Sequence, residues 1–208
     1  MKERPIIFRA EMVRAILAGR KTQMRRIVKP CHMATVDAEQ FPILAMCPYG
    51  SPGDRLWVRE TCRAEAIDDE GLCGVRYVAD KQFMPIENTR EASDRWVQLY
   101  WYRGMEGATV PPIHMPRWAS RITLEITDVR VERLQDISED DCLAEGIAQV
   151  VREKLPGIQQ CGEYDTIDVD PVAEYRDLWE SINGPESWAA NPWVWVIGFK
   201  KLEQQEQA

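Results

Sequence analysis

Residues 16–26 carry the strongest pattern in the chain and read Ile16-Leu17-Ala18-Gly19-Arg20-Lys21-Thr22-Gln23-Met24-Arg25-Arg26. Just before them, Met12, Ala15 and Ile16 fall at helical spacing within residues 11–18. Gly19 is typical of the residue that ends a helix. The pattern predicts a short helix that leads directly into a dense basic segment.

The charge of this region contrasts with that of the rest of the chain. The 208 residues carry a formal net charge of −8. Residues 1–30 hold nine basic and two acidic residues, a net charge of +7, whereas the other 178 hold 17 basic and 32 acidic residues, a net charge of −15. The asymmetry indicates either a site for a phosphate-bearing ligand or a solvated helix face. The acidic remainder disfavours extended binding to duplex nucleic acid and favours a small, focal site.

Composition excludes several classes of protein. With 45% hydrophobic and 29% charged residues, the chain is typical of a globular protein and not of a disordered one. We expect no membrane span, because no apolar run approaches 18 residues, and no signal peptide, because residues 1–5 lack an apolar core.

The cysteines and histidines predict neither a metal site nor a disulfide framework. The six cysteines form no C-x-x-C pair, and there are only two histidines. We therefore expect no metal and no cofactor, and reduced cysteines in a cytoplasmic protein. A catalytic unit built on Ser and His or on Cys and His is equally disfavoured.

Further along the chain, strands and helices alternate. A strand is predicted at 56–58, a long or bent strand at 118–134, and a closing strand at 193–202. Ser138 is expected to cap a helix with Asp141 at the capping-box position, and Asp170-Pro171 to start another helix. Residues 61–116 are interpreted as an irregular insertion, with a hairpin as one option, and residues 148–170 as an acidic loop. Together these features favour an α+β fold with a mixed β-barrel and flanking short helices, in one domain over 1–208.

Four segments in order resemble the ASCH domain family of the PUA-like superfamily. They are residues 16–26 and three further stretches, Gly53-Asp54-Arg55-Leu56-Trp57-Val58-Arg59-Glu60, Ile137-Ser138-Glu139-Asp140-Asp141-Cys142-Leu143-Ala144-Glu145-Gly146-Ile147 and Asn191-Pro192-Trp193-Val194-Trp195-Val196-Ile197-Gly198-Phe199. Over nearly its whole length the chain is similar to longer ASCH proteins carried by phages and prophages. The resemblance implies a PUA-like barrel and, by analogy with PUA domains, RNA binding.

Some small bacterial ASCH proteins are amidohydrolases that deacetylate N4-acetylcytidine with a Lys, a Thr and a Glu. On this sequence the resemblance puts the Lys at Lys21 and the Glu at Glu145. The Thr position holds Met24, which offers no hydroxyl nucleophile. We expect the Thr-dependent mechanism to be lost or severely weakened, unless Lys21 and Glu145 activate a water directly.

The candidate ligand-binding residues are Arg20, Lys21, Arg25, Arg26, Trp57 and Glu60. Arginine suits bidentate phosphate recognition, and Trp57 or Trp118 is a candidate for stacking a base. Structural alternatives stand beside each: a surface cation for Lys21, a solvated charge for Glu145, partners in the acidic body for Arg25 and Arg26, an arginine partner for Glu60, and core packing for the tryptophans.

The leading hypothesis is recognition of RNA, a nucleotide or a modified nucleoside in a cleft that contains Lys21, Arg26 and Glu145. The second is an amidohydrolase acting on N4-acylated cytidine. The third is a phage-encoded interaction module that binds a host protein through the acidic surface. The sequence leaves the oligomeric state open.

Overall fold

The computed structural model describes residues 1–29, 46–67, 72–147 and 170–203. Its main sheet has five strands: β1 (Glu3–Ile7), β2 (Gln23–Ile27), β3 (Arg55–Arg59), β7 (Thr123–Arg133) and β8 (Trp193–Lys201). Their order is β1-β3-β7-β8-β2, with β1 parallel to β3 and the other pairs antiparallel. The mixed α+β class is confirmed. Within the described residues the sheet curves without closing, since strand pairing ends at β1 on one edge and β2 on the other.

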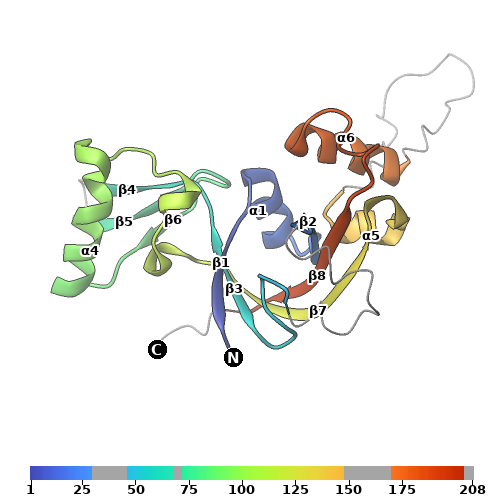
Figure 1. Cartoon of the computed structure of the whole chain (residues 1–208). Coiled ribbons are helices and arrows are strands. Elements are labelled where there is room, and N and C mark those ends of the chain that lie inside the picture. Colours follow the sequence, from blue (N-terminus) through green and yellow to red (C-terminus); the bar gives the residue numbers. More distant parts are fainter. Residues whose placement is uncertain (30–45, 68–71, 148–169, 204–208) are drawn as a thin grey trace, which may run out of the picture.

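Helix α1 (Ala10–Leu17) lies on the concave face of this sheet (Figure 1). Val13 and Ile16 pack there against strand residues such as Leu56 and Ile197, which are completely buried. The helix ends as predicted: Gly19 has a φ of +73°, and its N–H donates to the carbonyl of Ile16. This left-handed residue turns the chain sharply into β2, which sequence reasoning did not predict as a strand.

A long strand does lie within the predicted range 118–134, but β7 begins only at Thr123, after a 3-10 helix at Arg117–Ala119. Ile126 pairs with Phe199 and Asp128 with Gly198, so the ladder bulges between them. Side chains that faced the core before the bulge therefore resume that direction at Val129.

The predicted insertion is regular rather than irregular. It forms a second sheet of β4 (Cys62–Ile67), β5 (Leu72–Tyr77) and β6 (Phe83–Pro85), covered by helix α4 (Arg90–Tyr100). β4 and β5 form the expected hairpin. A separate hydrophobic core, which includes Cys62, Tyr77 and Trp96, joins the sheet to α4. Three short 3-10 helices then return the chain to β7: Tyr102–Gly104, Pro112–His114 and Arg117–Ala119.

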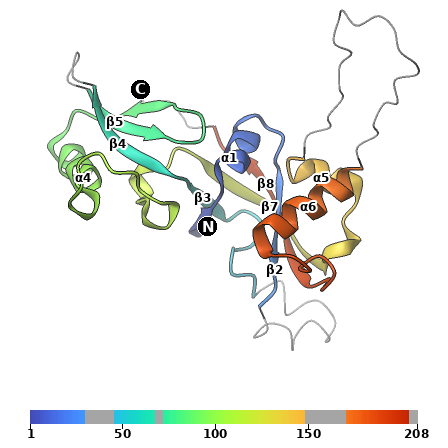
Figure 2. The same ribbon diagram turned by 90° about the horizontal axis from the view of Figure 1, so that it is seen from above.

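Two helices cover the opposite end of the main sheet. A 3-10 turn (Leu134–Asp136) leads into α5 (Glu139–Ala144), and α6 (Pro171–Asn183) precedes β8. Their N-caps are as predicted: Ser138 accepts from the N–H of Asp141, and Asp170 accepts from the N–H of Val172. Both views place this pair at the end of the molecule away from α4 (Figures 1 and 2). The acidic loop at 148–170 lies outside the described residues except for Asp170. No described helix is long and apolar enough to cross a membrane.

Candidate functional site

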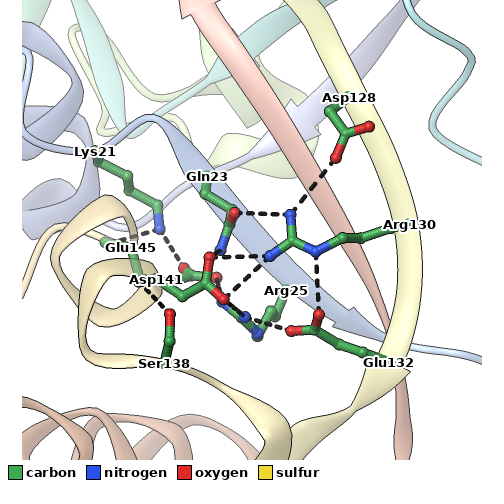
Figure 3. Close-up of polar contacts among 9 residues, drawn as sticks. All are labelled: Lys21, Gln23, Arg25, Asp128, Arg130, Glu132, Ser138, Asp141 and Glu145. Carbon is green, nitrogen blue, oxygen red and sulfur yellow. Dashed lines mark hydrogen bonds and ion pairs between the residues drawn. The ribbon is translucent and has the colours of Figure 1, made fainter.

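Lys21 and Glu145 meet at the junction of α1, β2 and α5. The Lys21 Nζ donates to the Glu145 carboxylate Oε2 at 2.6 Å and to the Glu145 backbone carbonyl at 2.8 Å. Both residues are buried, with exposed fractions of 3% and 7%. Glu145, the residue that follows α5, thus provides both acceptors for one ammonium group, which fixes the position of the Lys21 side chain (Figure 3).

Backbone contacts hold the end of α5 against the start of β2. The Thr22 backbone N–H donates to the carbonyl of Ala144. The guanidinium of Arg20 adds a side-chain contact, donating to the carbonyl of Gly146 at 3.3 Å. Gly146 has a φ of +93°, and a Cβ built there would lie 3.1 Å from the Cβ atoms of Ala15 and Lys21. A side chain at position 146 would push α5 away from Lys21, so the ion pair depends on this glycine.

A network of charges supports Glu145 from the other side (Figure 3). Arg25, whose side chain is fully buried, contacts the second carboxylate oxygen of Glu145 at 3.4 Å, Asp141 at 2.9 Å, and Glu132. Arg130 in turn binds both oxygens of Asp141, at 2.9 and 3.1 Å. The capping-box position is therefore used differently from the prediction: the Asp141 carboxylate faces these cations and Gln23.

These contacts set the protonation behaviour of the cluster. Burial lowers the pKa of Lys21, and the Glu145 carboxylate opposes that shift. Burial alone would raise the pKa of Asp141, yet the hydrogen bond from Gln23 and the charges of Arg25 and Arg130 bring it below its ordinary value of 3.8. The carboxylate of Asp141 is thus held ionised in the folded protein.

The Lys21–Glu145 pair forms part of the wall of a pocket of about 50 Å³. The polar lining also includes Arg25, Arg26 and Asn183. The apolar lining comes from the chain before α1, from α1 itself, from β2 and from α6: Phe8, Met12, Met24, Ile27, Tyr175, Leu178, Trp179 and Ile182. The pocket therefore combines a charged pair with hydrophobic and aromatic walls, as ligand sites commonly do.

The contribution of α6 was not predicted as part of a site. In the sequence, the helical spacing of Tyr175, Trp179 and Ile182 indicates only the packing face of a helix. Tyr175 and Trp179 do pack in the core beneath α5 and α6, and they also line the pocket. Periodicity identifies the buried side of a helix, and it does not distinguish core from pocket wall.

Two predicted binding arginines differ sharply in accessibility. Arg26 is partly exposed; it donates to the backbone carbonyl of Ile7 at 3.1 Å and lies 5.9 Å from the Phe8 ring centroid. Arg25, in contrast, is buried: its two Nη atoms contact the carboxylates of Glu132, Asp141 and Glu145, and its Nε has no hydrogen-bond partner among the described residues. These contacts match the alternative in which Arg25 pairs with acids of the body, and its role as a phosphate ligand stays a prediction. Arg20 is exposed and lies outside the pocket lining.

Glu60 and Trp57 do not share this pocket. Glu60 is buried and forms a bidentate pair with Arg121 at 2.8 and 3.0 Å, at the junction of the two sheets. Glu60 is thus the partner of an arginine, and that arginine is Arg121 rather than Arg25 or Arg26.

The Trp57 ring lies within 6 Å of the guanidinium groups of Arg59 and Arg117. Trp118 packs against the core of the second sheet. Trp57 and Glu60 therefore lie outside the pocket lined by Lys21 and Glu145, and their roles in ligand binding stay predictions.

Met24 and Thr22 lie two positions apart in the chain, and one is buried whereas the other is exposed. Met24 is almost completely buried in the main core and lines the pocket. Thr22 is exposed and does not line it. No hydroxyl of position 22 therefore replaces the one missing at position 24. Among the described residues no group of acids, cysteines and histidines could hold a metal ion.

Comparisons with known proteins give one likeness to report. No family model matches the chain, and no curated protein matches it. Among solved structures it is similar to one described as the high-resolution crystal structure of an ASCH domain from Lactobacillus crispatus JV V101. That match covers 96% of this chain and 79% of the other, with 13% sequence identity and a TM-score of 0.38.

Proposed function

We propose that this protein binds a nucleotide-like ligand, free or within a single strand of RNA, in the pocket lined by Lys21, Glu145 and Arg26. The observation that carries the proposal is the geometry of the Lys21 ammonium. A protonated lysine has three N–H donors, and two of them are directed to Glu145. The third remains for a ligand in the pocket that Lys21 lines.

The surroundings of the pair favour a flat heterocycle with adjacent donor and acceptor groups. Lys21 supplies a donor, and the neighbouring Glu145 carboxylate has lone pairs left to accept an exocyclic N–H. The flanking walls from Phe8, Met12 and Leu178 are apolar and suit the faces of a base. Arg26, partly exposed on the same pocket, is suited to contact a phosphate.

Calorimetric titration with cytidine 5′-monophosphate, and separately with a short single-stranded RNA, tests this proposal. Lys21→Met should weaken binding at least tenfold, as expected for the loss of a charged hydrogen bond worth about 1.5–3 kcal/mol. Lys200→Met is the matched control, since Lys200 is exposed and pairs with Glu125 on β7. Equal binding by both variants, or no binding by the unaltered protein, would overturn the proposal. Tighter, more salt-sensitive binding of the RNA would identify a strand as the ligand.

A second candidate, hydrolysis of N4-acylated cytidine, is favoured by the burial of Lys21. Burial lowers the pKa of this lysine, and a neutral amine would turn a lone pair towards the pocket in place of the third donor. It would then take a proton from a water that adds to the acyl carbon, and Glu145 would pass a proton to the departing amine. With Met24 in place of a hydroxyl, this route relies on water alone. Release of cytidine from N4-acetylcytidine, abolished in Lys21→Met, would distinguish hydrolysis from binding.

A further inference from the structure

The side chain of Tyr175 is nearly buried, and its hydroxyl has no hydrogen-bond partner among the described residues. Only 3% of the residue is exposed, and the ring packs beneath α5 and α6. The hydroxyl makes no hydrogen bond to any residue in the described part of the chain. Most polar side-chain atoms in such positions are bonded, so an unbonded one requires an explanation.

The position of the ring supplies that explanation. Tyr175 lines the pocket that holds the Lys21–Glu145 pair. Because its hydroxyl makes no hydrogen bond to the described residues, a ligand in this pocket is the partner that remains for it.

Trp179 adds a ring to the same wall. It lies one turn after Tyr175, its ring centroid 6.2 Å away, and it also lines the pocket. Its indole Nε1–H is sealed from solvent and has no hydrogen-bond partner among the described residues, so this nitrogen offers no donor to a ligand. The wall formed by α6 therefore combines the flat face of Trp179 with the hydroxyl-bearing ring of Tyr175, whereas the opposite wall offers the Lys21–Glu145 pair.

We propose that the Tyr175 hydroxyl is a specificity-determining group that donates a hydrogen bond to an acceptor atom of the ligand. This inference rests on the proposed binding pocket and adds a requirement to it. The ligand must carry an acceptor, such as a ring carbonyl or unprotonated ring nitrogen, on the side that faces α6. Burial, and after it the charge of Glu145, raises the pKa of Tyr175, so the phenol stays protonated and can donate.

Tyr175→Phe tests the inference, because it removes the hydroxyl and keeps the packed ring. We expect binding of cytidine 5′-monophosphate to weaken about 5- to 15-fold, the equivalent of one neutral hydrogen bond. Tyr102→Phe is the matched control. The Tyr102 hydroxyl is also buried without a partner, but it belongs to the second sheet's surroundings and not to this pocket. Unchanged affinity in Tyr175→Phe would overturn the inference while leaving the binding pocket itself in place.

A measurement without any ligand keeps the inference separate from the identity of the nucleotide. If the hydroxyl is reserved for a ligand, its removal from the empty protein should leave the urea midpoint of unfolding unchanged or higher. A lower midpoint would show that the hydroxyl has a structural partner, and would overturn the inference whether or not a nucleotide binds. An unchanged or higher midpoint with no nucleotide binding by the unaltered protein would support the reserved donor and refute the nucleotide.

Discussion

The carboxylate and the backbone carbonyl of Glu145 both accept hydrogen bonds from the ammonium of Lys21, a residue 124 positions earlier in the chain. Two contacts to one residue make the pair rigid. They also couple the position of α5 to that of β2, so a substitution at either residue should affect the position of both elements.

The first prediction concerns the energy of this pair. Removal of one partner from a buried ion pair costs about 3–5 kcal/mol, and Lys21→Met should fall near the lower limit because Arg25 still contacts Glu145. In a double-mutant cycle with Glu145→Gln, urea unfolding should give a coupling energy of about 1–3 kcal/mol. The exposed pair Glu11–Arg14 is the control, with coupling below about 0.5 kcal/mol. Additive effects at Lys21 and Glu145 would contradict a coupled pair.

The second prediction concerns acid. The pKa of Asp141 is lower in the folded protein than its ordinary value of 3.8. The folded state therefore binds fewer protons, and the stabilisation from Asp141 is present above pH 3.8 and lost as the pH falls through the lower, folded-state pKa. Asp141→Asn should be less stable near neutral pH, and its difference from the unaltered protein should shrink in acid. Urea midpoints measured from neutral pH downwards test this, and a constant difference would refute it.

The third prediction concerns Met24. Met24→Thr places a hydroxyl on the pocket lining beside Lys21, and we expect it to raise the rate of N4-acetylcytidine hydrolysis above that of the unaltered protein. Loss of the buried methionine should cost about 2–3 kcal/mol of stability, so the assay requires a check that the variant is folded. Equal rates with Met and Thr would show that position 24 does not limit the chemistry.

The fourth prediction separates Glu60 from the ligand site. Glu60→Gln should lower the free energy of unfolding by about 1–3 kcal/mol, because Arg121 loses the bidentate carboxylate of Glu60 and keeps the ion pair with Asp80. Nucleotide affinity, measured below the unfolding transition, should change less than twofold. A loss of nucleotide affinity without a loss of stability would show that Glu60 takes part in ligand binding.

The fifth prediction tests Arg26 as a phosphate contact. Arg26→Gln should weaken binding of cytidine 5′-monophosphate and leave the weaker binding of cytidine unchanged, since only the former carries phosphate charge. Arg20→Gln is the control, because Arg20 is exposed and lies outside the pocket. Equal losses for nucleotide and nucleoside would assign Arg26 to another part of the ligand or to packing.

Sequence patterns predicted most helix starts and the long strands because local chemistry fixes them. Ser138 and Asp170 cap their helices in the predicted way, and the shift of face in β7 is visible as a change of alternation at Val129. β2 was missed because its buried face carries Gln23 and Arg25, whose charge partners come from α5 and β7. A strand buried through ion pairs lacks the apolar alternation that identifies strands.

The insertion did contain a readable signal. Cys62, Ala64 and Ala66 alternate with polar neighbours in β4, and Ala92, Trp96 and Leu99 are spaced as one face of α4. The meeting of Lys21 and Glu145 is different. Nothing within either segment specifies it, and it was expected only from the resemblance of both segments to a known family.

The pairing of β2 with β8 determines when the pocket can exist during synthesis of the protein. β2 is complete at Ile27, but in the sheet it pairs with β8, which begins at Trp193. Until β8 has left the ribosome, strand β2, which carries Met24 and Arg26 and directly follows Lys21, has no neighbour in the sheet. The pocket, and with it the proposed binding of a ligand, therefore forms only once nearly all of the described residues have been translated. A chain interrupted before β8 would present the basic segment without the pocket.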